Sequence, residues 1–148
     1  MFDNHLEKEE IQEAKILWFS CISMLRAIGH VMDKVDRKNQ PESFSIALDI
    51  AYEEWRKLPI FKNFINEERN SILKEYSFTI EPTSIDKTFY LVDSDGHYLV
   101  DGSQHLVSYE TVSDLIKTNG YDTSQHPSLI LEEALIWWNE ELTKLEKN

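Results

Sequence analysis

The most constraining feature of this sequence is an apolar stretch over residues 16–32, in which Arg26 and His30 are the only basic or acidic side chains. Apolar residues recur at three- and four-residue steps through and around it, which predicts one long helix over residues 7–38. A guanidinium and an imidazole on an apolar helix need polar partners. Arg26 and His30 lie one helical turn apart, so they are the starting point for a candidate site.

The apolar stretch is a core helix by this interpretation and not a membrane span. It is shorter than the roughly 20 residues that cross a bilayer, and Arg26 lies near its middle. Ser20, Ser23 and Ala27 form a strip of small residues on another side, which this chain or a second copy could cover. The single cysteine, Cys21, is expected to be a buried small hydrophobe.

Composition limits the classes of function. A chain of 148 residues predicts one domain, residues 1–148, that can bury its own core. The net charge of −12 opposes phosphate backbones and anionic membranes, and no local Lys/Arg cluster is visible. We therefore expect no direct nucleic-acid binding and no membrane association. The first residues lack a basic segment and a cleavage site, which favours a cytoplasmic location.

Later segments predict a mainly helical α+β fold, a four-helix bundle with a small antiparallel β-meander inserted before the last helices. Pro41 separates the first helix from a second one over residues 42–57. A third helix is expected over 60–75, a β-insertion over 76–108, a short helix over 109–118 and the last helix over 127–146. Within the insertion, residues 93–97 (DSDGH) begin like a calcium loop but lack its later ligands, so a hairpin turn is preferred.

A second pair of charges indicates where a site could form. At 100° per residue, Glu68 and Arg69 fall within the apolar face of the third helix. If the first and third helices are neighbours, Arg26 or His30 could meet Glu68, with Arg69 and Asn70 at the edge. Three interpretations stay open: side chains that reach solvent, a structural salt-bridge network, or a ligand-binding or catalytic site.

The segment 68–75 (ERNSILKE), in its helical setting, resembles the HEPN group of helical proteins, which is common in bacterial toxin and defence loci. Active members of that group are metal-independent ribonucleases, usually dimeric, whose signature is an Arg, often an Asn, four to six further residues and a His. Arg69 and Asn70 match its beginning, but Lys74, Glu75 and Tyr76 stand where the His would fall. The resemblance therefore implies a bundle and a dimer more than an activity.

Signatures of other chemistries are missing from the sequence. It contains no Glu-x-x-His, Cys-x-x-Cys, Gly-x-Ser-x-Gly or Gly-rich phosphate loop, so we expect no metal and no cofactor. The favoured function is a non-catalytic, acidic interaction or small-ligand-binding protein of bacterial type that forms a homodimer. One alternative is a degenerate HEPN-like ribonuclease using Arg69, Asn70 and His30. Another is an acidic antitoxin or nucleic-acid mimic that binds a basic protein.

Overall fold

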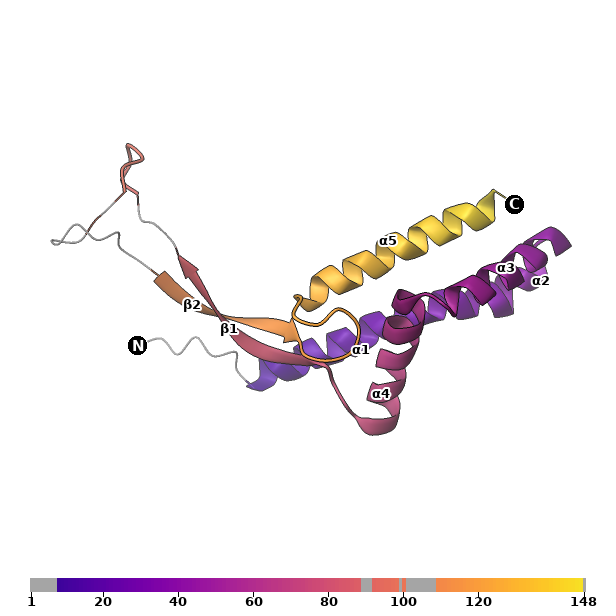
Figure 1. Ribbon diagram of the computed structural model, residues 1–148, viewed down its shortest axis with the longest axis horizontal. Helices are drawn as coiled ribbons and strands as arrows, with labels where there is room; N and C mark the ends of the chain where they lie inside the picture. Colours follow the sequence, from indigo (N-terminus) through magenta and orange to yellow (C-terminus); the bar gives the residue numbers. More distant parts are fainter. Residues whose placement is uncertain (1–7, 89–91, 99, 101–108, 148) are drawn as a thin grey trace.

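The computed structural model describes residues 8–88, 92–98, 100 and 109–147, and it is mainly helical with a small antiparallel sheet (Figure 1). The first helix, α1 (Lys8–Val31), continues through a π-helical turn, η1 (Met32–Asp36), into α2 (Arg37–Asn39). Next come α3 (Glu42–Trp55), a π-helical segment η2 (Ile60–Asn66) that leads into α4 (Glu67–Glu75), and finally α5 (Pro127–Glu146). The four predicted long helical segments are confirmed.

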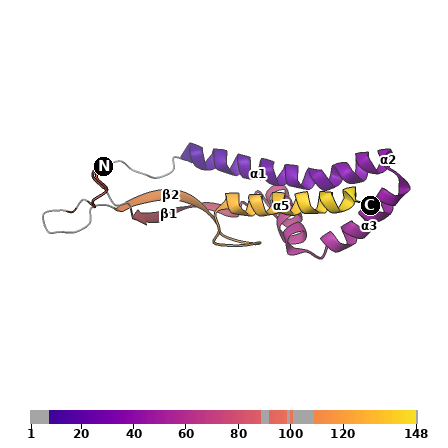
Figure 2. The same ribbon diagram turned by 90° about the horizontal axis from the view of Figure 1, so that it is seen from above.

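The helices form one bundle with the sheet projecting from it. α1 and α5 lie side by side in both views, and α3 folds back beside the far end of α1 (Figures 1 and 2). α4 runs at a steep angle to α1 and contacts it (Figure 1). The predicted neighbourhood of the first and third helices is therefore confirmed, which is the condition for a shared site.

The sheet corrects one prediction. β1 (Ile80–Thr88) pairs antiparallel with β2 (Tyr109–Lys117), so that Ile80 lies opposite Lys117. The short helix predicted over 109–118 is therefore wrong, because pairing with a distant strand supplies the backbone partners that a helix would otherwise supply. Of the expected meander, a bridge between Val92 and Tyr98 is present. Residues 89–91, 99 and 101–108 lie outside the described part of the chain.

The core is an aromatic cluster where α1, α3, η2 and α5 meet. Trp55 is completely buried, with its ring centroid 4.9 Å from that of Tyr52 and 5.1 Å from that of Trp138. The indole N–H of Trp55 donates to Glu141 Oε2 at 2.7 Å, which joins α3 to α5. The Tyr52 hydroxyl donates to the carbonyl of Gly29 at 2.5 Å. A Cβ added at Gly29 would lie 2.9 Å from that hydroxyl, so the close approach of α1 and α3 depends on this glycine.

α1 is apolar on more than its buried face. Its core side consists of Trp18, Ile22, Leu25 and Gly29. Among the described residues, the continuous helix Lys8–Asn39 is the one with the length and apolar composition to cross a membrane, and 28% of its most apolar window is buried. One side of this helix therefore builds the core, and a second apolar side does not.

Tyr76 ends α4 in a left-handed conformation with φ 51°, and its N–H donates to Ile72 O at 3.0 Å. This conformation suits glycine, because it costs a residue with a Cβ about 1 kcal/mol. The side chain is 86% exposed, so little packing would be lost on its removal. We expect Tyr76→Gly to raise the free energy of unfolding by about 0.5–1 kcal/mol, measured by urea denaturation. Ser77→Gly, at the exposed residue that follows, is the control and should not stabilise the protein.

Candidate functional site

A cleft between α1 and α4 contains three of the side chains that the sequence marked. Ser23, Arg26, Ala27 and His30 contribute from α1, and Arg69 contributes from α4. The volume is about 390 Å³, which suits a small molecule. We call it the first cleft. It brings Arg69 together with Arg26 and His30, which lie far from Arg69 in the sequence.

The donors of the first cleft lack acidic partners. In the part of the chain that the structure describes, neither Arg26 nor Arg69 forms an ion pair. The Arg26 guanidinium lies over the Phe61 ring, 5.9 Å from its centroid, and Arg69 Nη1 donates to Asn70 Oδ1 at 3.4 Å. The Ser23 hydroxyl is buried and has no hydrogen-bond partner among the described residues. The first cleft is thus a positively charged site whose arginine donors have no acidic partner in the described part of the chain.

A second cleft of about 350 Å³ adjoins the first and shares Arg26 and His30 with it. Its other walls are charged or aromatic side chains: Asp33, Arg37, Asp49, Tyr52, Glu53 and Arg56. In contrast to Arg26 and Arg69, the two arginines that line only this cleft, Arg37 and Arg56, are paired with carboxylates. Arg37 Nη2 lies 2.7 Å from Asp49 Oδ1, and Arg56 Nη1 lies 2.8 Å from Glu53 Oε1.

These ion pairs change the acidity of the groups in the second cleft. The hydrogen bond from Arg37 holds the pKa of Asp49 below its usual range, and the same contact raises the pKa of Arg37. The pKa of Asp33 is lowered by a hydrogen bond from Lys34 and by the charges of Lys34 and Arg37. Arg37 therefore already has two carboxylate partners, Asp33 and Asp49. An external anion would have to compete with these carboxylates for the guanidinium.

The two clefts contain every arginine of the chain, which are Arg26, Arg37, Arg56 and Arg69, and no lysine lines either of them. Arginine presents a planar fork of N–H donors that matches a carboxylate or a phosphate, whereas lysine is a point charge. Arg37 and Arg56 were not predicted as site residues. They are separated in the sequence from Arg26 and Arg69, and folding brings all four to one region.

Glu68 lies elsewhere, contrary to the prediction that it meets Arg26 or His30. Its Oε2 is 2.9 Å from Nζ of Lys117, at the end of β2, and both residues are almost fully buried. Its Oε1 accepts from the indole N–H of Trp18 at 3.3 Å and from the Thr79 hydroxyl. Lys117 also donates to the carbonyl of Asn119. Neighbouring residues on a helix point about 100° apart, so Arg69 faces the first cleft while Glu68 faces the sheet.

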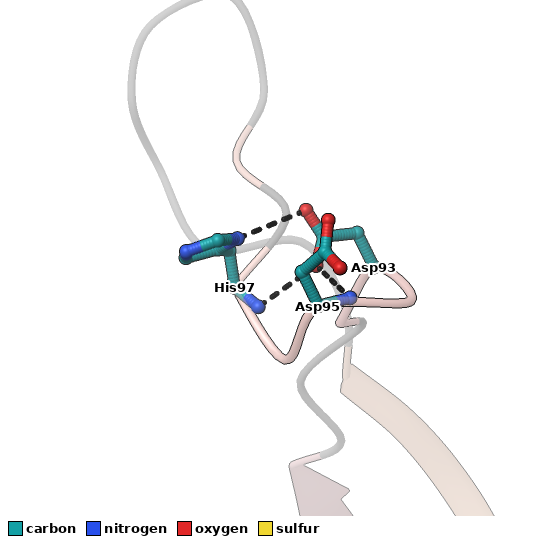
Figure 3. A group of neighbouring side chains, drawn as sticks. All are labelled: Asp93, Asp95 and His97. Atoms are coloured by element: carbon teal, nitrogen blue, oxygen red, sulfur yellow. Dashed lines mark hydrogen bonds and ion pairs between the residues drawn. The ribbon is translucent and has the colours of Figure 1, made fainter.

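The 93–97 segment is a hairpin turn, as predicted, and Figure 3 shows the side chains of Asp93, Asp95 and His97 in it. Asp93 Oδ1 accepts from the backbone N–H groups of Asp95 and His97, both at 2.9 Å, and its Oδ2 lies 3.3 Å from His97 Nδ1. These contacts, above all the N–H of His97, hold the pKa of Asp93 below its usual range. The side chains of Asp93, Asp95 and His97 lie close enough to share one cation. The Asp93 oxygens, however, already take part in the hydrogen bonds of the turn.

One Asp–His–Ser arrangement was not predicted from the sequence. His126 Nε2 lies 3.0 Å from Asp114 Oδ1, and Nδ1 lies 2.6 Å from the Ser128 hydroxyl. The backbone N–H of Ser128 also donates to Nδ1, at 3.2 Å, so His126 caps the first turn of α5. The three residues therefore join β2 to the start of α5. No sequence motif marked them, because Asp114 lies on β2 and the other two residues lie at the start of α5.

Comparison with known proteins gave no match: no family model, curated protein or solved structure is significantly similar to this chain. Its function is therefore inferred from the geometry of the clefts.

Proposed function

We propose that the protein binds a small anionic ligand, with a carboxylate or phosphate group, in the first cleft and without catalysing a reaction. The observation that carries this proposal is the convergence of Arg26 and Arg69 without a carboxylate partner among the described residues. Acidic residues number 27 against 15 basic ones in this chain, so carboxylates are abundant. Two arginines that face one cleft without a carboxylate partner among the described residues leave donors for an external anion, although Arg26 also contacts the Tyr52 hydroxyl and Arg69 contacts Asn70.

The energetics favour short-range recognition. A net charge of −12 repels anions at a distance, so long-range attraction supplies none of the affinity. Hydrogen bonds to a charged group contribute about 1.5–3 kcal/mol each, and a bidentate arginine contact forms two. His30 lines both clefts and can donate or accept a hydrogen bond at the ligand.

The Cys21 thiol is free, which suits a cytoplasmic protein.

Isothermal titration with inorganic phosphate, pyrophosphate and citrate tests this proposal. We expect millimolar or tighter binding of at least one of these anions. Arg26→Gln and Arg69→Gln should each weaken it about tenfold or more, because each removes a charged donor. Lys74→Gln removes the same charge from α4 outside the cleft and is the matched control, which should bind like the wild type. Equal affinity in Arg69→Gln and Lys74→Gln would contradict the proposed site.

The ribonuclease alternative keeps one supporting observation, which is that His30 reaches the cleft of Arg69 from another helix. A metal-independent ribonuclease needs a general acid or base beside a phosphate-binding arginine, and this pair supplies both types of group. RNA cleavage in the presence of a chelator, lost in both Arg69→Ala and His30→Ala, would overturn the non-catalytic proposal in favour of this alternative.

A further inference from the structure

The second apolar side of α1 has a regular spacing. Its residues follow one another at alternating steps of three and four positions, with Val35 on the adjoining η1 and the others on α1: Ala14, Leu17, Cys21, Met24, Ile28, Val31 and Val35. We call this row the outer seam. Leu17 is 64% exposed and Met24 62% exposed, although both lie on a helix whose other side is in the core. The mean step of 3.5 residues is the heptad period of helices that wind around each other.

The outer seam continues onto the neighbouring helix. Leu131 and Leu135 of α5 join the central seam residues in lining an apolar groove of about 320 Å³. Ala14, Cys21 and Ile28 are half-buried, whereas the other four seam residues, Leu17, Met24, Val31 and Val35, are exposed. A contiguous apolar strip of this kind marks an interaction surface on a protein. Its period indicates that the occupant is a helix with the same repeat.

We propose that the occupant is the outer seam of a second copy of this chain, packed antiparallel about a two-fold axis. Two copies of the outer seam have the same residue spacing because they have the same sequence. A two-fold dimer brings the same patch of both copies together. Ser20 and Ala27 flank the seam and are small, so the two helix backbones can approach closely. With the axis between Cys21 and Met24, each Leu17 packs against Ile28 of the other copy.

Charge decides the orientation. Glu13 and Lys34 continue the flanking row of Ser20 and Ala27 at seven-residue steps, one at each end. An antiparallel arrangement places Glu13 of one copy beside Lys34 of the other, and the two-fold axis repeats this pair, so the dimer contains two such pairs. In a parallel arrangement the two copies of this row lie on opposite flanks of the helix pair, so Glu13 and Lys34 do not meet. Lys34 also pairs with Asp33 of its own chain at 2.7 Å but stays 61% exposed, so its remaining donors are accessible.

This dimer is independent of the proposed ligand site. Arg26 lies two residues from both Met24 and Ile28, which places it on roughly the opposite side of α1. Ala27 borders both surfaces, since it lines the first cleft and flanks the outer seam. The charged side chains of the clefts lie away from the seam and stay accessible when the outer seams are joined. Loss of ligand binding and loss of the dimer can be measured separately.

The oligomeric state in solution tests the proposal. We expect sedimentation equilibrium at micromolar concentration to give twice the chain mass of 17.4 kDa. Leu17→Glu and Met24→Glu should each give a monomer whose circular dichroism keeps the helical signal. Ile16→Glu is the matched control, because Ile16 lies on the same helix, is 63% exposed and is not in the outer seam, so it should stay dimeric. A monomeric wild type at 100 μM, or equal dissociation in Ile16→Glu, would overturn the proposal.

Cysteine cross-linking tests the orientation. In a Cys21→Ser background, a mixture of Glu13→Cys and Lys34→Cys should give heterodimers with a short bismaleimide. Glu13→Cys alone should give none, and cross-linking of that variant to itself would overturn the antiparallel arrangement. Flotation of the wild type with neutral lipid vesicles, lost in Met24→Glu, would assign the outer seam to a membrane surface and would also overturn the proposal.

Discussion

Lys117→Met is expected to lower the free energy of unfolding by about 3–5 kcal/mol, because it leaves a buried carboxylate without its counter-charge. Glu68 is 4% exposed and Lys117 is 1% exposed, so water cannot replace the lost ammonium in the folded protein. The remaining donors to the carboxylate, the Trp18 indole and the Thr79 hydroxyl, are neutral. Urea denaturation followed by far-ultraviolet circular dichroism measures the change.

Two further variants separate the ion pair from a general effect of losing lysine. Glu68→Gln combined with Lys117→Met removes both charges and should recover a large part of the loss. Lys57→Met breaks an exposed pair with Glu54, in which both side chains are 66% exposed, and should change stability by less than about 1 kcal/mol. A cost for Lys117→Met as small as that for Lys57→Met would show that the buried pair does not stabilise the junction of α4 and β2.

The second large effect is expected for Trp55→Ala, at about 3–5 kcal/mol of lost stability. Trp55 is completely buried and contacts aromatic rings from α3, η2 and α5, so its removal opens a cavity where three elements meet. The same measurement of urea unfolding by circular dichroism applies, since a change of tryptophan content would disturb fluorescence.

Trp55→Phe is the matched variant for the cavity. It keeps an aromatic ring but loses the hydrogen bond to Glu141, whose carboxylate still pairs with Lys144 at 2.6 Å. We expect a loss of about 1–2 kcal/mol. A loss in Trp55→Phe equal to that in Trp55→Ala would assign the effect to the hydrogen bond and not to packing.

Local signals in the sequence were sufficient for the helices. The last helix begins at Pro127 and ends at Glu146 as predicted, because a proline at the first turn and a regular apolar stripe are local features. β2 was missed for the opposite reason. Its partner, β1, lies more than twenty residues earlier, and nothing within residues 109–117 reveals that pairing.

The candidate site was predicted in part. Spacing alone placed Arg26 and His30 on the first predicted helix and Arg69 on the third, and the structure brings these three into one cleft. Spacing could not decide whether Glu68 or Arg69 lies beside Arg26 and His30, because both lie within the apolar arc of α4. It also gave no role to Lys117, whose burial depends on the strand that was missed. The expected homodimer and the acidic antitoxin alternative stay predictions.

The position of the buried ion pair has a mechanical consequence. The two-stranded sheet extends from one end of the helical bundle (Figure 1). Lys117 is the last residue of β2 and lies where the sheet joins the bundle. A load on the projecting sheet would act on the contact between Lys117 and Glu68. Separating these charges in a nonpolar surrounding costs more than separating them in water. We therefore expect the base of the sheet to resist movement away from α4.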